Sequence, residues 1–228
     1  MLLEVSCGSV DQALLAAEYG ADRVELCAAL STGGVTPSLG AFKYLKSQIN
    51  IPIFIMIAQP EANFSPPEPD FQAMLHDVSI FSNAGADGFV FGCITAANTL
   101  DIPRNQALVA ASQGLPCTFH RAFDSIHNPH KTAQQLTDLG FARILTSGHA
   151  SSADKGIQLI RELIQNHPVQ ILPGGGVRPE NALSLKNAGA TELHFSITKS
   201  GTKMGYLDYP LPDHCPERIT QTRIALST

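Results

Sequence analysis

The stretch NAGADGFVFGC, residues 83 to 93, decides how the whole chain is interpreted. Gly85 stands where a helix would end in the left-handed conformation, and an apolar run follows almost at once. Three further stretches, EYGADRV, DLGFARI and NAGATEL, repeat this plan. Each predicts the end of a helix followed by a strand, so the chain is interpreted as repeats of one structural unit.

Eight short apolar runs match the strands that such units require. They are rich in Val, Ile, Leu and Phe, and segments with helical spacing separate them. The predicted strands cover residues 2–7, 23–28, 52–57, 88–93, 116–121, 143–147, 169–174 and 192–196. Eight such units without an interrupting domain favour a closed TIM-like (β/α)8 barrel over an open sheet.

Helical spacing predicts helices at residues 10–19, 69–83, 102–112, 130–139, 152–166 and 179–187. Ser9, Asp70 and Ser151 are expected as N-caps, and Pro179 as the first residue of its helix. Residues 216–226 also have helical spacing. We therefore expect a single domain, with a barrel in residues 1–200 and a C-terminal loop and helix, residues 201–228, packed on it.

Composition narrows the classes of function. The chain has 228 residues, of which 44% are hydrophobic, enough for a large core. Charged residues make up 15% and the net charge is −5, so no nucleic-acid partner is expected. No targeting segment or membrane span is recognised, and five cysteines without a CxxC pair suggest reduced thiols. We expect a soluble, cytoplasmic protein.

Side-chain alternation predicts a polar barrel interior. Glu4 and Ser6 share one face of the first strand, and Glu25 and Cys27 share one face of the second. Their apolar neighbours should pack against the helices, so these four side chains should point inward. The same parity groups further polar residues, namely Thr118 with His120, and Glu192 with His194 and Ser196.

The stretch TFHRAFD, residues 118 to 124, places polar residues at the carboxyl end of a strand, where such barrels carry their active sites. The candidate catalytic residues are His120, Arg121, Asp124, Glu4 and Glu25. Two carboxylates and the imidazoles of His120 and His194 suit acid–base chemistry or a hard or borderline metal. The alternative is a polar network that satisfies its own hydrogen bonds, for instance with Arg121 paired to a buried glutamate.

The loops after the last three strands offer a second candidate site. Gly174, Gly175 and Gly176 allow a ligand to approach the backbone closely, and the following helix N-terminus attracts anions. Ser147 and Lys199 complete the predicted anion-binding set. The alternative is a tight turn between strand and helix.

Six stretches carry a resemblance to a known family: GADRVELCAALSTGGVTPSLG, GADGFVFGCIT, LPCTFHRAFD, ARILTSGHASSADKGIQLIREL, ILPGGGVRPEN and GATELHFS. In this order and at similar spacing they resemble the CutC copper homeostasis family, over nearly the whole chain. The resemblance implies a TIM-like barrel, a cytoplasmic location, a role in copper handling, and no established reaction.

The resemblance also implies where copper would bind. The family pattern has cysteines at the positions of Ser6 and Cys27, and Cu(I) prefers thiolate and thioether ligands. Serine replaces the first of this pair here, which leaves Cys27 and His194 as the candidate metal ligands, with Met56 as a further sulfur. Other departures from the family pattern fall at the same end of the barrel, at Gly8, Ala58, Glu61 and residues 195–198.

The sequence therefore supports two hypotheses about function. The first is a role in copper homeostasis, with copper ion as the partner and Cys27 as the key residue. The second is an enzyme that acts on a small phosphorylated or carboxylated, hence anionic, metabolite, with His120 and Glu4 or Glu25 as acid and base. A scaffold that acts through contacts between copies, as a homo-oligomer, is a third interpretation.

Overall fold

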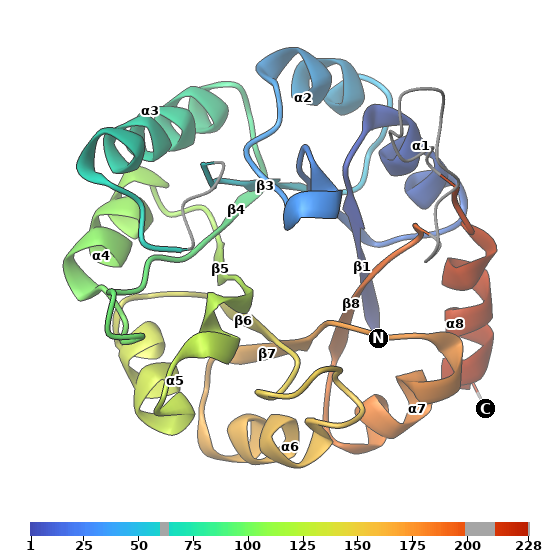
Figure 1. The fold of residues 1–228 in the computed structure, drawn as a ribbon. Coiled ribbons are helices and arrows are strands. Elements are labelled where there is room, and N and C mark those ends of the chain that lie inside the picture. Colours follow the sequence, from blue (N-terminus) through green and yellow to red (C-terminus); the bar gives the residue numbers. More distant parts are fainter. Residues whose placement is uncertain (60–63, 199–212, 228) are drawn as a thin grey trace.

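A ring of parallel strands lies inside a ring of helices (Figure 1). The computed structural model describes residues 1–59, 64–198 and 213–227. Within these, the sheet has eight strands in the order β7-β6-β5-β4-β3-β2-β1-β8, and β7 and β8 lie side by side where the ring closes. The prediction of a TIM-like (β/α)8 barrel is confirmed.

All eight strands lie where they were predicted, and none is longer. They are β1 Leu2–Cys7, β2 Arg23–Leu26, β3 Ile53–Met56, β4 Gly88–Phe91, β5 Cys117–Phe119, β6 Arg143–Thr146, β7 Gln170–Pro173 and β8 Glu192–Ser196. The register places Glu4 of β1 opposite both Arg23 of β2 and His194 of β8. Two residues further along β1, Ser6 lies opposite Glu25 of β2. Polar residues of three strands thereby meet inside the barrel.

The helices follow the strands in turn. They are α1 Val10–Glu18, α2 Leu39–Lys46, α3 Glu68–Asn83, α4 Ile102–Ala111, α5 Pro129–Asp138, α6 Ile157–Asn166, α7 Pro179–Asn187 and α8 Glu217–Ser227. Two short 3-10 helices cover Leu30–Thr32 and Arg121–Ser125. The helix α2, which has only eight residues, was not predicted from the sequence. The last helix, α8, packs beside α7.

Two of the expected helix starts were correct. The Ser9 hydroxyl accepts the Gln12 N–H at 3.2 Å, and Pro179 begins α7. Asp70 was wrong as an N-cap, because α3 begins two residues earlier, after Pro67. Ser151 was also wrong, because the chain turns through residues 153–156 before α6 begins.

The core has two unequal parts. The larger part lies between strands and helices and includes the outward side chains of β1, such as Leu3, Val5 and Cys7. The smaller part comprises only Cys27, Phe54, Met56 and Val90. Buried charged groups occupy much of the rest of the barrel interior, so the fold holds a polar site within an apolar shell. Among the described residues, no helix combines the length and apolar character that a membrane span requires.

Candidate functional site

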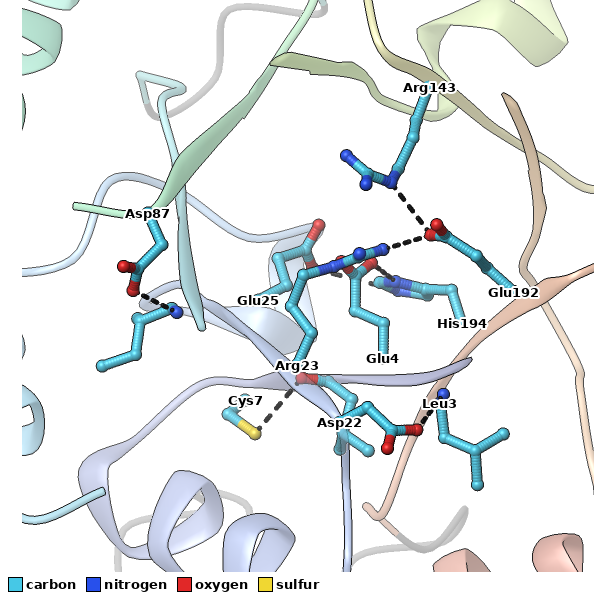
Figure 2. Close-up of polar contacts among 12 residues, drawn as sticks. Leu3, Glu4, Cys7, Asp22, Arg23, Glu25, Asp87, Arg143, Glu192 and His194 are labelled. Atoms are coloured by element: carbon cyan, nitrogen blue, oxygen red, sulfur yellow. Dashed lines mark hydrogen bonds and ion pairs between the residues drawn. The ribbon is translucent and has the colours of Figure 1, made fainter. Parts of the chain in front are cut away.

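An ion-pair layer fills the barrel interior near the amino ends of its strands (Figure 2). Glu192 accepts from Arg23 at 2.6 Å and from Arg143 at 2.9 Å, so it joins β8 to β2 and β6. The Phe54 ring packs against both guanidinium groups, with its centroid 4.7 Å from that of Arg23 and 5.3 Å from that of Arg143. An aromatic face attracts a nearby cation, so the Phe54 ring stabilises both guanidinium groups. Together with Glu192 they close this end of the barrel.

Glu4 links this layer to the next one. One of its carboxylate oxygens pairs with the Arg23 Nε, and the other lies 2.6 Å from the Nδ1 of His194. Burial alone would raise the pKa of Glu4, but the His194 hydrogen bond and the Arg23 charge outweigh it and lower the pKa to about 2. Glu4 is therefore an ionised acceptor, which fixes the orientation of His194.

Glu25 lies on the other side of the His194 ring. Its Oε2 is 3.9 Å from the His194 Nε2, and its buried Oε1 has no hydrogen-bond partner among the described residues. Burial raises the pKa of Glu25 to about 7, against the lowering effect of the His194 charge. The pKa of His194 is raised despite burial, by the charge of Glu25 and the bond to Glu4. The charge of each group therefore acts on the pKa of the other, an arrangement that suits acid–base chemistry.

A cavity of about 370 Å³ opens above this pair, at the carboxyl ends of the strands. Glu25 and His194 form its floor, and Met56, Phe64 and His120 contribute to its walls. Three arginines also line it, namely Arg121, Arg178 and Arg218. A volume of this size admits a small molecule, and the three guanidinium groups favour an anionic one.

The TFHRAFD stretch ends β5 and begins a 3-10 turn at the cavity wall. The Nδ1 of His120 accepts the Ala122 N–H at 3.3 Å, which ends the strand sooner than predicted. Burial lowers the pKa of His120 to about 4, so its ring is neutral at pH 7. With Nδ1 occupied as an acceptor, the proton resides on Nε2. His120 therefore offers a hydrogen-bond donor rather than a positive charge.

Asp124 and Arg121 from the same stretch are held by the loop after β6. The Asp124 carboxylate accepts the N–H of Ser147 at 3.1 Å and the hydroxyl of Thr146 at 2.5 Å. Arg121 donates to Asp124 at 2.9 Å and to the Ser147 hydroxyl at 3.0 Å. Asp124 thus accepts from both the N–H and the hydroxyl of Ser147, a residue of the predicted anion-binding set, and it positions Arg121 at the cavity.

The predicted glycine cradle follows β7. Gly175 and Gly176 have φ values of 88° and 74° and line the cavity, whereas Gly174 is buried and does not line it. A β-carbon on Gly175 would lie 3.3 Å from the Arg121 guanidinium carbon, so the arginine lies close above this backbone. Lys199, the remaining predicted anion ligand, and Glu61, a departure from the family pattern, lie outside the described residues.

The sulfur atoms are divided between the two parts of the core. Cys27 faces the barrel interior beside Met56, as alternation predicted; a β-carbon on Gly34 would lie 3.5 Å from the Cys27 Sγ and 3.8 Å from the Met56 Cε. Cys7 faces the opposite way, into the helix-facing core. Burial raises the pKa of the Cys27 thiol far above its usual range.

Sequence reasoning missed four arginines of this region. Arg23 and Arg143 lie on strands, and alternation would have placed Arg23 with Glu25 because the two are two positions apart on one strand. Arg178 and Arg218 come from the start of α7 and from α8. No periodicity relates these last two positions to the strands, so only the folded structure brings them to the cavity.

Comparisons with known proteins agree over most of the chain. The CutC family model matches residues 1–199. A family protein CutC from Enterobacter sp. (strain 638) is 43% identical over 199 residues, which cover 87% of this chain and 81% of that protein. The human copper homeostasis protein cutC homolog is 41% identical over 198 residues, or 86% of this chain and 72% of that protein.

Solved structures show the same relationship. A CutC crystal structure from Streptococcus agalactiae matches with a TM-score of 0.81 and 31% identity, over 86% of this chain and 98% of that one. A 3-hexulose-6-phosphate synthase matches with a TM-score of 0.65 and 18% identity, over 99% of this chain and 100% of that one. At that identity the second likeness concerns the fold alone.

Proposed function

Because this chain belongs to the CutC family, we propose that it takes part in copper homeostasis by holding a Cu(I) ion at the mouth of its barrel. The human relative carries copper homeostasis in its name. The observation that carries the proposal is the placement of Cys27 beside Met56 inside the barrel, because a thiolate and a thioether are ligands that Cu(I) prefers. A reducing compartment such as the cytoplasm suits the five free thiols.

The surroundings of Cys27 determine how a Cu(I) ion can bind to it. Its thiol donates to the Cys7 carbonyl at 3.3 Å and is buried, so a Cu(I) ion must displace the thiol proton. Ser6, where the family pattern has a second cysteine, lines the cavity with a hydroxyl that is a poor ligand for a soft cation. We therefore expect one thiolate ligand per chain rather than two.

Anaerobic titration of the reduced protein against a Cu(I) chelator tests the copper site. The wild type should bind one Cu(I) per chain, and Cys27→Ser should weaken binding by at least about tenfold, or 1.4 kcal/mol. Cys117→Ser is the matched control, because this thiol is also buried but lies in the helix-facing core. Equal affinities for the wild type and Cys27→Ser would exclude the site.

The cavity favours a second function, the binding and conversion of a small phosphorylated or carboxylated metabolite. The observation that favours it is the Glu25–His194 pair beneath three arginines. In this role Arg121 would bind the anionic group, His120 would donate from Nε2, and the Glu25–His194 pair would move a proton.

Thermal stability in the presence of anions tests this second function. Inorganic phosphate and a series of small carboxylates should raise the melting temperature of the wild type, because they bind only the folded protein. Arg121→Gln should reduce this shift, whereas Lys43→Gln, on exposed α2, should leave it unchanged. A shift that is the same in all three proteins would place anion binding elsewhere. To look for a reaction, metabolites should be screened with the wild type, and His120→Ala should be the comparison.

A further inference from the structure

We propose that Glu25 and His194 bind a divalent transition-metal cation at the floor of the cavity, with Glu4 as a positioning residue. This site takes nitrogen and oxygen ligands and does not rest on the Cu(I) proposal, whose ligands are sulfur atoms. The ligand atoms that Glu4, Glu25 and His194 can offer all lie within 4.8 Å of one another, and all three residues are buried.

The hydrogen bond between His194 and Glu4 leaves the Nε2 of His194 available as one ligand. Its Nδ1 is 2.6 Å from Glu4, a carboxylate whose other oxygen is already paired with Arg23. An ionised carboxylate only accepts, so the hydrogen must be on Nδ1, and in the neutral ring Nε2 carries a lone pair. This arrangement of carboxylate, imidazole and metal recurs in metalloproteins, where the carboxylate fixes the tautomer and the direction of the ring. Here the free nitrogen faces Glu25.

Glu25 supplies the second ligand, and its unpaired oxygen is a separate observation that points to a bound cation. It is only 2% exposed, yet its Oε1 has no hydrogen-bond partner among the described residues. Its Oε2 lies 3.9 Å from the His194 Nε2, too far for a hydrogen bond. That separation fits two ligands of one cation, each about 2.0 to 2.2 Å from it.

The surrounding charges leave Glu25 as the carboxylate that needs a cation. Arg23 is paired with Glu4 and Glu192, and Arg143 with Glu192, so two arginines and two glutamates balance one another (Figure 2). Only the His194 ring faces Glu25 at ion-pair distance among the described residues. A buried carboxylate oxygen without a hydrogen-bond partner, here the Oε1 of Glu25, is costly, and a bound cation removes that cost.

The cavity gives access to the site and indicates the kind of metal. Glu25 and His194 both line it, so a cation can enter from the mouth, and Ser6 and Ser196 line it nearby. One carboxylate and one imidazole suit Zn²⁺, Fe²⁺, Co²⁺ or Ni²⁺ rather than Ca²⁺ or Mg²⁺, which prefer oxygen alone. A dication on one carboxylate keeps a positive charge, which would attract an anionic ligand or hydroxide into the cavity.

Titration of the full-length reduced protein with Co²⁺ alone, followed by visible absorption, tests the proposal. The wild type should bind one Co²⁺ per chain without the absorption of a thiolate–cobalt bond. Glu25→Gln should weaken binding by at least about tenfold, in line with losses of about 10- to 100-fold for second-shell changes alone. Cys27→Ser should bind as the wild type does. No saturable binding, or an unchanged affinity in Glu25→Gln, overturns the site.

Two controls separate this site from alternatives. His130 and His167 form another imidazole pair, 3.2 Å apart, so binding that is lost in His130→Asn and kept in Glu25→Gln overturns the proposal. Should Glu25→Gln not fold, X-ray absorption of the wild-type complex decides instead: nitrogen and oxygen ligands with imidazole scattering support the site, and a sulfur ligand overturns it.

The positioning role of Glu4 has its own measurement. In the wild type, ¹⁵N chemical shifts of His194 should report a hydrogen on Nδ1, and Glu4→Gln should populate the other tautomer because an amide can also donate. Co²⁺ affinity should fall by about 10- to 100-fold with it. A Glu4→Gln protein with weakened binding but an unchanged His194 tautomer would show that Glu4 does not act through the ring.

Discussion

At the scale of the residue, the barrel interior makes each side chain depend on a specific neighbour. Gly88 of β4 is an example, because the Phe54 ring from β3 occupies the space that a side chain would need. A β-carbon there would lie 2.6 Å from the ring. The ring is buried and in contact with the guanidinium groups of Arg23 and Arg143, so moving it would disturb both.

Gly88→Ala should therefore destabilise the protein. Overpacking of this kind costs about 1 to 3 kcal/mol, which urea unfolding can measure. Adding Phe54→Leu should recover part of the loss, because the shorter side chain frees the space, so the two changes should be non-additive. Additive losses in the double variant would mean that the ring is not the source of the clash.

His120 gives a pH-dependent prediction. Burial lowers its pKa in the folded state to about 4, against 6.5 for an ordinary histidine. As the pH falls from 6.5 to 4, the unfolded chain takes up a proton that the folded one does not, so the free energy of unfolding should fall in this window, by roughly 3 kcal/mol at most. Above pH 6.5 this contribution should be constant.

Side-chain NMR of the folded protein measures the His120 titration directly, with the urea-unfolded protein as the reference. The imidazole resonances of His120 should stay those of a neutral ring down to about pH 4. In His120→Gln the loss of stability between pH 6.5 and 4 should be smaller. A His120 midpoint near 6.5 would show that burial does not disfavour the charged ring and would contradict the prediction.

At the scale of the element, strands could be predicted from sequence more fully than helix starts. Short runs of buried β-branched and aromatic residues between helical segments identify a strand, and alternation then predicts which side faces inward. This is why Glu4, Glu25 and His194 could be brought together before the structure. The helix α2 could not be identified, because eight residues hold barely two turns of periodic signal.

The start of α6 could not be predicted for a different reason. Ser151 is a suitable N-cap residue, but the preceding loop packs Gly148 directly against Gly156, with no space for a β-carbon at either position. That contact delays the helix to Ile157. Contacts between distant segments carry no periodicity in the sequence, and Arg178 and Arg218 were missed for the same reason.

A helix cap supplies the prediction at this scale. The Asn128 side chain accepts the Lys131 N–H at 3.2 Å and so begins α5. Asn128→Ala should lower stability by about 1 kcal/mol, because the first turn loses an acceptor. Gln134→Ala, an exposed site on the same helix whose side chain bonds to its helix neighbour Asp138, should change stability by less than about 0.5 kcal/mol. Equal effects would deny Asn128 a capping role.

At the scale of the whole molecule, the ion-pair layer holds distant parts of the chain together. Glu192 of β8 bonds to Arg23 of β2 and to Arg143 of β6. Neither β2 nor β6 is consecutive with β8 in the sequence, so these bonds join distant segments of the chain. The pairs are largely buried, with side-chain exposures of 3% for Arg23 and 13% for Glu192. Removing the shared carboxylate would leave two guanidinium groups with less compensation in a low-dielectric interior.

Glu192→Gln should therefore cost about 3 to 5 kcal/mol, the range for breaking a buried ion pair. The surface pair Lys46–Asp87 is the comparison: its side chains are 36% and 33% exposed, so Lys46→Met should cost less than about 1 kcal/mol. Urea unfolding should show a lower midpoint for Glu192→Gln with an unchanged slope, because the barrel loses stability without losing buried surface. A changed slope, or equal costs for the two variants, would mean that the layer does not join the barrel into one cooperative unit.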